Sequence, residues 1–445
     1  MIQLLEIIKL IVDHITVGSY TANIIMRTTF IFYILLCSGA ITAQEDGYDI
    51  STYVTPDFSY QILSVSPSLT NRKGPSSLIL ETELRSSFFS QKYSRKRISE
   101  TTFSFNGENT RRKTTSDTTS TTAMIGSLDY RNQFFYKEKR FITLDGEGGF
   151  IYVSEKNIDE TAYIGLGDLS LKPHWGIGRT ELVTDAWHAK AILKAFKKKG
   201  LLQRQPNQKE VEAFAQAITA IKNTRRLDFR FERIYEMEQM VNYLGESGMV
   251  ATDNFLFFAT LNDAWLFEGF RNRRSGSTWQ IGPTGQVLGA FTSSALFSVN
   301  GAESNTSSID SRYGIETIYE NYIAAGDFQI DLSAGIIYGK AYQRGKFNNS
   351  DITTNTFSYT NIDATVDVDY LVSSRIILGA SFMNSYTDMD FRKYTNFTRF
   401  NFDIQYFIAP RLSITGNAGV FFNKTEREMA RKSTNFFISM DYILL

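Results

Sequence analysis

The last ninety or so residues alternate polar and apolar side chains over several consecutive stretches. Successive side chains of a β-strand point to opposite faces of a sheet, so this alternation predicts strands with one apolar and one polar face. In residues 361–372 one parity is entirely apolar, and the other carries Asp363, Asp367 and Asp369. A similar division recurs farther along, as far as residues 436–444. Long strands with aromatic ends and Asn, Asp and Thr on one face are typical of a barrel in lipid with a wet interior.

The composition favours a barrel over other membrane architectures. The chain of 445 residues has 35 Phe and 23 Tyr, and aromatic side chains make up 14% of it, which suits two aromatic girdles. The 47 basic and 47 acidic side chains balance, so the net charge indicates no nucleic-acid partner. Mean hydropathy is slightly negative, which argues against a bundle of membrane helices.

The N-terminal region predicts a secretory leader. Met26 and Arg27 precede an apolar run and then small residues that end near Ala43. We therefore expect a leader over 1–43, with Met26 as the start and a signal peptide over 26–43; a genuine N-terminal helix is the alternative. The single Cys, Cys37, lies in this leader, so the mature chain is expected to have no disulfide, thiol catalysis or Cys-ligated metal. No metal site and no cofactor are expected.

The remaining chain divides into two sets of strands around a helical segment. Barrel strands are predicted over 44–173 and 274–445, about fourteen in all, with twelve or sixteen also compatible because such barrels favour even numbers. Between them the period becomes helical, which predicts an insertion of three or four α-helices over 174–273. The fold class is therefore an antiparallel, all-β transmembrane barrel with a helical insert.

Local signals place the helices inside this insert. A first helix is expected over 184–199, and a second one begins at an Asn207-x-x-Glu210 capping pattern. A third stops at Gly245, and a fourth covers 253–267. Each carries an apolar stripe, so we expect the helices to pack together as a small subdomain.

The connections between strands predict the location of the protein. Tight connections, for example near 324–327 and 409–410, alternate with longer polar ones. Short turns on one side and long loops on the other are typical of the bacterial outer membrane. Because the last strand of such barrels ends in the periplasm, counting back places the helical insert there. We expect a monomer or small oligomer in contact with outer-membrane lipids and lipopolysaccharide.

A motif at the entry to the insert carries a family resemblance. Residues 175–186 read WGIGRTELVTDA, and Gly200, Asp228-x-Arg230 and Asp263-x-Trp265 follow. This set resembles a largely uncharacterised family of outer-membrane barrel proteins from Bacteroidota, strongly in the middle third of the chain and elsewhere only in pattern. The resemblance implies a secreted barrel with a helical insert and no established activity. Thr180 departs from the aliphatic residue that is more frequent in relatives.

Within this motif we expect a hinge between barrel and insert at Gly176, Gly178, Arg179 and Glu181. Gly176-x-Gly178 lacks the third glycine of a phosphate-binding turn, so the hinge interpretation is favoured. The Arg179 and Glu181 pair is expected to cap the insert or to hold it under the barrel rim. His174 and His188 are both expected at or within the insert, and His188 is expected to be packed or solvated.

Two groups of charged residues are candidates for function. The first is expected to line the lumen and consists of Asp363, Asp367, Asp369, Asp403 and Arg411. The second group lies in a stretch without acidic residues. It is either a solvated helix face or a binding surface for an anionic partner, namely inner-leaflet lipid headgroups, peptidoglycan carboxylates or an acidic periplasmic protein. It consists of Lys190, Lys194, Lys197, Lys198 and Lys199.

Three functions are compatible with these patterns. The first is a passive or gated channel, similar to a porin, for small polar solutes. The second is a structural or assembly anchor that presents the insert to a periplasmic protein or to peptidoglycan. The third and weakest is an outer-membrane hydrolase. Because the sequence shows no plausible catalytic constellation, an enzyme is not predicted.

Overall fold

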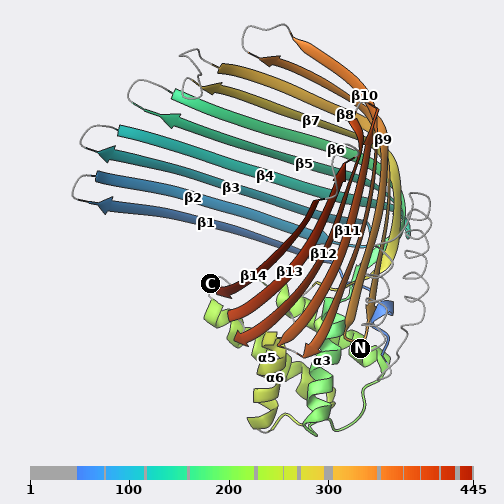
Figure 1. Cartoon of the computed structure of the whole chain (residues 1–445). Helices are drawn as coiled ribbons and strands as arrows, with labels where there is room; N and C mark the ends of the chain where they lie inside the picture. The colour runs from blue at the N-terminus through green and yellow to red at the C-terminus, as the bar shows by residue number, and fades with distance from the viewer. Residues whose placement is uncertain are drawn as a thin grey trace. The chain divides into compact units, whose positions relative to one another are not determined.

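Fourteen strands form a single sheet, and neighbours in sequence are neighbours in the sheet from β1 to β14 (Figure 1). The computed structural model describes residues 48–445 except 75–76, 115–117, 158–160, 225–228, 254, 268–271, 295–303, 348–351, 374, 391, 410–411, 426–430 and 443–445. The strands are β1 (Phe58–Lys73), β2 (Ser77–Tyr93), β3 (Arg97–Thr114), β4 (Thr118–Lys137), β5 (Arg140–Lys156), β6 (Thr161–Leu182), β7 (Arg274–Ser294), β8 (Ser304–Ala325), β9 (Phe328–Phe347), β10 (Thr353–Ser373), β11 (Ile376–Met389), β12 (Arg392–Ala409), β13 (Leu412–Thr425) and β14 (Arg431–Tyr442).

The prediction of about fourteen antiparallel strands with a helical insert is confirmed. Every adjacent pair of strands is antiparallel. Strands β1 and β14 form the two edges of the sheet, and in the part of the chain that the structure describes they do not pair with each other. The predicted leader, residues 1–43, lies outside the described residues.

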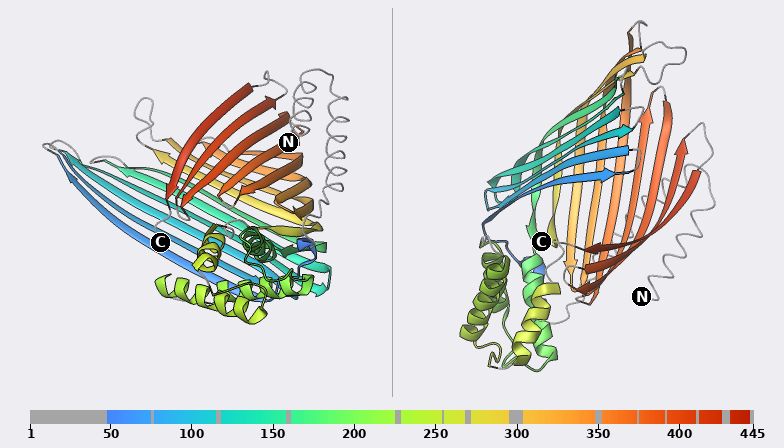
Figure 2. Two further views of the ribbon diagram at one scale, coloured as in Figure 1. Left: turned by 90° about the horizontal axis from the view of Figure 1, so that it is seen from below. Right: turned by 90° about the vertical axis from the view of Figure 1, so that its left-hand side faces the viewer.

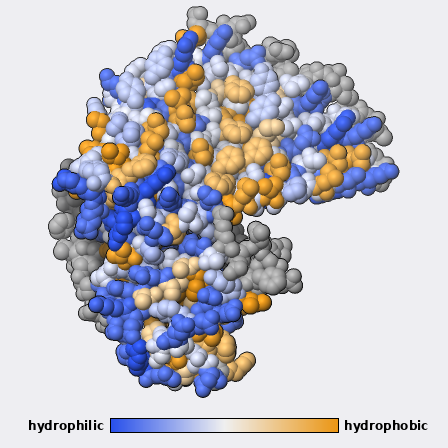
Figure 3. All heavy atoms as spheres, turned by 180° about the vertical axis from the view of Figure 1, so that it is seen from behind, coloured by the Kyte–Doolittle hydropathy of each residue, from blue (hydrophilic) through white to orange (hydrophobic). Residues whose placement is uncertain are grey.

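The two faces of the sheet differ in chemistry as the alternation predicts. Ile315 and Tyr338 are directly paired on β8 and β9, and they are 62% and 65% exposed. Their sequence neighbours Glu316 and Ile337 are paired on the opposite face, where Glu316 is only 6% exposed. Apolar side chains are visible in patches over the strands in the space-filling view (Figure 3). We call these the apolar face and the polar face.

Four helices lie between β6 and β7 and pack together (Figure 2). The second one has the predicted capping box, since the Asn207 side chain accepts a hydrogen bond from the N–H of Glu210 and the Glu210 carboxylate accepts one from the N–H of Asn207. The third passes through Gly245, its predicted end, and stops one residue before Gly248, which has a φ of +60°. The helices are α3 (Thr184–Lys198), α4 (Gln208–Lys222), α5 (Phe229–Ser247) and α6 (Phe255–Phe267).

The insert has its own apolar core. Phe196, Phe214 and Leu261 from three helices are fully buried in it. Tyr53, which follows the short helix η1 (Ile50–Thr52), is 1% exposed in the same core, so the segment before β1 packs with the insert. None of the helices in the described residues is long and apolar enough to cross a membrane.

The insert begins later than residue 174, the predicted boundary. Strand β6 continues to Leu182 because residues 175–182 pair with 274–281 of β7. That partner lies almost one hundred residues away in sequence, so no local pattern could reveal the pairing. His174 is therefore a residue of the sheet and does not belong to the insert.

Candidate functional site

Ionisable side chains on the polar face are held in pairs that cross the strands. Nε of Arg131 on β4 lies 3.6 Å from Oδ1 of Asp145 on β5, and its Nη1 lies 3.9 Å from Oε1 of Glu320 on β8. Nε2 of His174 on β6 lies 3.3 Å from Oε2 of Glu316, and both side chains are almost completely buried. These pairs join strands β4, β5, β6 and β8 on one face.

Four of the five residues predicted to line a lumen share the polar face. Asp367 on β10 is directly paired with Asp331 on β9, which sets two carboxylates opposite each other. Asp369 pairs with Gly379 of β11, and Gly379 pairs with Asp403 of β12. Like charges directly opposite on a sheet are destabilising, so the pairing of Asp367 with Asp331 opposes the association of β9 and β10. Asp363 lies on the same parity of β10, and Arg411 lies outside the described residues.

The polar face also contains a cavity of about 220 Å³. Residues of the seven consecutive strands β5 to β11 line it, so side chains from strands as far apart as β5 and β11 contribute to one cavity. Its charged groups are Glu147, Lys172 and Arg312. The sequence analysis did not identify Lys172 or Arg312 as candidate site residues. The only sequence signal for them was their position on the polar side of the alternating pattern. The other lining residues are Ser170, Thr284, Gln286, Ile337, Tyr359, Asn361, Thr387 and Met389.

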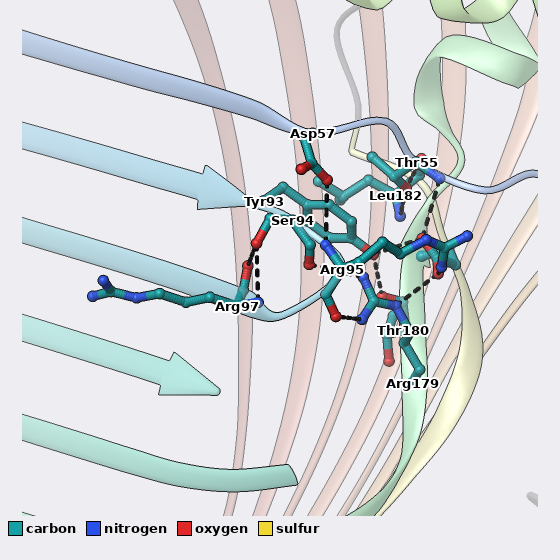
Figure 4. Close-up of polar contacts among 10 residues, drawn as sticks. Thr55, Asp57, Tyr93, Ser94, Arg95, Arg97, Arg179, Thr180 and Leu182 are labelled. Carbon is teal, nitrogen blue, oxygen red and sulfur yellow. Dashed lines mark hydrogen bonds and ion pairs between the residues drawn. The ribbon is translucent and has the colours of Figure 1, made fainter. Parts of the chain in front are cut away.

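Glu181 is the centre of a polar cluster where β6 ends. Its partners Thr55, Tyr93, Arg95 and Arg179 are labelled in Figure 4. Its Oε1 accepts hydrogen bonds from Nε of Arg179 at 2.8 Å and from Nη1 of Arg95 at 3.2 Å. Its Oε2 accepts bonds from the hydroxyl of Tyr93 at 2.7 Å and from the N–H of Thr55 at 3.1 Å. These five residues, which we call the rim clasp, join the segment before β1, the β2–β3 turn and the end of β6.

Arg179 also contacts the β2–β3 turn directly. Its Nη1 donates to the carbonyl of Arg95 at 3.0 Å and its Nη2 to the carbonyl of Ser94 at 3.1 Å. The guanidinium lies 4.5 Å from the centre of the Phe135 ring, a cation–π distance. The Arg179 and Glu181 pair therefore holds a turn of the sheet. It does not cap the insert, because α3 begins after Val183 without a side-chain cap.

The two motif glycines occupy different environments, and neither lies at a junction with the helices. Gly178 has a φ of +104°, and a Cβ there would lie 2.0 Å from the carbonyl oxygen of Ser277 on β7. Gly176 lies under the ring of Phe141, which would be 2.4 Å from an added Cβ. Both are residues of β6, which passes Gly178 with a positive φ, and the hinge itself stays a prediction.

The insert is tied to the short turns of the sheet. Nη1 of Arg273 donates a 2.8 Å hydrogen bond to the carbonyl of Gly326 in the β8–β9 turn. Nη2 of Arg375, beside the β10–β11 turn, lies 3.2 Å from Oδ1 of Asp263 on α6. Leu266 of α6 packs against Ile377 and Phe407, which lie on the polar face of β11 and β12.

The predicted lysine patch is divided between internal contacts and solvent. Nζ of Lys190 lies 3.4 Å from the carbonyl oxygen of Tyr48, and Nζ of Lys194 lies 3.4 Å from Oδ2 of Asp327. Lys197 also interacts within the chain. Lys198 and Lys199 are exposed at the end of α3, where cations stabilise the helix dipole.

His188 is a core residue of the insert. Its ring is fully buried, lies 5.1 Å from the Trp265 ring and has Nε2 3.4 Å from the carbonyl oxygen of Ala264. Burial lowers the pKa of His188 well below its usual value, and the charge of Lys222 lowers it further. The imidazole is therefore neutral at pH 7.

Comparison with known proteins gives similarity of fold alone. No protein-family model and no curated protein matches the chain, so the resemblance to the Bacteroidota family stays a prediction. Among solved structures, the CymD monoaromatic hydrocarbon channel is 8% identical, with a TM-score of 0.30 over 88% of this chain and 90% of that one. The translocator domain of the autotransporter NalP from Neisseria meningitidis is 9% identical, with a TM-score of 0.28 over 90% and 97%.

OmpT, an outer membrane protein of Vibrio cholerae, is 10% identical, with a TM-score of 0.26 over 87% of this chain and 96% of that one. Similarity at this level carries no argument about transport, substrate or activity. The solved structures that the chain resembles are outer-membrane β-barrel proteins.

Proposed function

We propose that this chain is a β-barrel of the bacterial outer membrane that conducts small polar solutes, with the helical insert over the turn end of its lumen. The observation that carries the proposal is the division of the sheet into an exposed apolar face and a polar face with a cavity. In a closed barrel the first would meet lipid and the second would line the lumen. Closure of the barrel would pair the edge strands β1 and β14. Because the number of strands is even, this pair would also be antiparallel.

Aromatic side chains at the turn end of the apolar face support a membrane boundary there. Trp175 and Trp279 are 41% and 38% exposed, and their rings meet edge to face at 6.4 Å. The indole N–H of Trp175 donates a 2.6 Å hydrogen bond to the hydroxyl of Tyr136, which is 52% exposed. Trp and Tyr are enriched at the interface between lipid and water.

The contacts of the insert suit a gate that covers the lumen. The Lys194–Asp327 and Arg375–Asp263 pairs are both about half exposed, so each contributes about 0–1 kcal/mol. Leu266 reaches the polar face, so the end of α6 lies on the side that would be the lumen. For the insert to separate from the β8–β9 and β10–β11 turns while the rim clasp stays intact, these weak pairs and the hydrogen bond from the buried Arg273 to Gly326 would have to break.

Conductance of the full chain in planar bilayers tests this proposal. We expect discrete conductance steps, and changed step sizes in Asp363→Asn, Asp367→Asn and Asp369→Asn because each removes a charge from the lumen wall. Asp253→Asn, an exposed position in the insert, is the control that should leave step size unchanged. A folded protein without conductance steps would overturn the channel.

A second candidate, the anchor, rests on uncovered apolar side chains at the start of α6. Phe255, Leu256 and Phe258 are 86%, 43% and 49% exposed, although the insert has its own core. Phe257 stacks on Phe196 at 5.4 Å, so this end of α6 lies beside the lysine-rich end of α3. Exposed apolar patches of this kind mark interaction surfaces. We propose a periplasmic protein or peptidoglycan as the partner.

In-cell photo-crosslinking tests the anchor. A photoreactive residue at position 255 should capture one defined species, and the same residue at position 212 on α4 should not. Phe258→Ser should reduce the capture and leave the bilayer conductance of the chain unchanged. Equal capture from both positions would count against a dedicated surface.

A further inference from the structure

We infer that the cavity on the polar face binds a small zwitterionic solute, one that carries a carboxylate and an ammonium group with a short apolar side chain, such as a free α-amino acid. The inference rests on the proposed function only for the route by which the solute enters. The cavity itself is lined by residues of the seven consecutive strands β5 to β11.

The first observation is a loosely joined pair of opposite charges at the cavity wall. Nζ of Lys172 lies 3.7 Å from Oε1 of Glu147, which is longer than a hydrogen bond. The Glu147 side chain is 56% exposed and the Lys172 side chain is 24% exposed, although both lie on the polar face. Neither charge is saturated by the other, so a carboxylate can bind at Lys172 while an ammonium binds at Glu147.

The second observation is a cation that is held in position but still has donors available. Nη2 of Arg312 donates a 3.0 Å hydrogen bond to Oδ2 of Asp310. Nε2 of Gln343 donates to the same oxygen at 3.1 Å, which fixes that carboxylate. A guanidinium has five N–H donors in a planar fork that matches a carboxylate, so Arg312 can also bind the acidic end of a solute.

The third observation is the mixture of polar and apolar groups between these charges. Ile337, Met389 and the ring of Tyr359 form an apolar part of the wall. Beside Tyr359 and Met389 on the same two strands, Oγ1 of Thr387 donates a 2.7 Å hydrogen bond to Oδ1 of Asn361, and Thr284 lines the same space. A cavity of about 220 Å³ restricts the solute to a small molecule.

These groups discriminate among solute classes by charge. A simple anion would match Lys172 and Arg312 but not Glu147, and a simple cation would match Glu147 but not Lys172 or Arg312. A neutral sugar would match none of the three charges, which would keep only the partners they have in the structure, Glu147 with Lys172 and Asp310 with Arg312. Removing water from a charge without offering it an opposite charge is costly, so the zwitterion is the class for which this wall is complementary.

Calorimetric titration of the folded full chain in detergent with L-leucine tests this inference. N-acetyl-L-leucine and L-leucine methyl ester serve as comparison ligands because each lacks one of the two charges. We expect leucine to bind about tenfold or more tightly than either, since a hydrogen bond to a charged group is lost in each case. Equal affinity for leucine and one comparison ligand, or no binding of leucine, would overturn the inference.

Substitutions of residues that line the cavity, with a matched control, complete the experiment. Glu147→Gln and Arg312→Gln should each weaken leucine binding about tenfold, and Lys340→Gln, on the apolar face, should leave it unchanged. Folding of each variant is checked by its mobility shift on heating in detergent electrophoresis. If leucine binds to a chain that shows no conductance, the channel fails and the binding site stands. If the chain conducts and leucine does not bind, the binding site fails and the channel stands.

Discussion

The hydroxyl of Tyr93 donates a 2.7 Å hydrogen bond to Oε2 of Glu181, which lies 88 residues further along the chain. The same hydroxyl also lies 2.8 Å from the carbonyl oxygen of Thr180. These contacts attach the end of β2 to the end of β6, although three strands separate them in the sheet. The insert begins directly after β6, so these contacts lie immediately before the first helix in the chain.

We predict that Glu181→Ala destabilises the folded chain by about 3 kcal/mol, since it leaves the buried charge of Arg179 without its counter-charge. The side chains of Arg179 and Glu181 are only 6% and 15% exposed, so solvent cannot replace the lost contacts. The free energy of unfolding would be measured by urea titration in detergent, followed by tryptophan fluorescence. Glu212→Ala on α4 is the control, and an equal effect of both substitutions would argue against the rim clasp.

Gly178→Ala should be far more harmful than Gly200→Ala. Both glycines have positive φ angles, of +104° and +69°, so alanine is strained at either position. At Gly200 no atom lies within 4 Å of an added Cβ, and we expect a loss of about 1 kcal/mol. At Gly178 the backbone of Ser277 occupies that space, so β6 and β7 cannot pair as observed. The yield of folded, heat-modifiable protein distinguishes the two, and similar yields would contradict the close approach of Ser277 to Gly178.

The stability of the insert should fall as the pH drops below about 6.5, the ordinary pKa of His188. Burial in the folded state lowers this pKa. The contribution of the neutral imidazole to the free energy of unfolding is therefore complete above pH 6.5, and it decreases below that pH by up to about 1.4 kcal/mol per pH unit. Lys222 and Trp265 are the groups that face the ring. Unfolding at pH 7.5 and at pH 5.0 would be compared for the unchanged chain and for His188→Phe, which can still stack. An unchanged pH dependence in the variant would refute the assignment.

Acid should loosen the start of α4 at lower pH. Hydrogen bonds from Arg204 and from the N–H of Asn207 lower the pKa of Glu210 to about 2. Because this pKa is lowered, the contribution of the capping box to stability is present above about pH 4.5 and disappears as the pH falls toward 2. Exchange of the amide protons of α4 between pH 6 and pH 3, corrected for intrinsic rates, would show this. Glu210→Gln should remove the trend, and its persistence would assign the acid sensitivity to another group.

Much of the architecture follows from local patterns in the chain. The period of two along strands and the period of 3.6 along helices arise from backbone geometry within a few residues. Fourteen strands, four helices and the Asn207 capping box could therefore be predicted with no knowledge of contacts. The polar face that holds Asp363, Asp367, Asp369 and Asp403 was visible for the same reason.

Contacts between distant segments could not be predicted in this way. The position of Glu181 beside Tyr93, the end of β6 at Leu182 and the meeting of Glu147, Lys172 and Arg312 depend on register and on how the sheet curves. Alternation tells which face a side chain occupies, but it does not tell which other side chains reach the same place. The sequence therefore determined the two faces of the sheet, and long-range pairing determined the rim clasp and the cavity, because partners up to about 240 residues apart meet only after the strands have assembled.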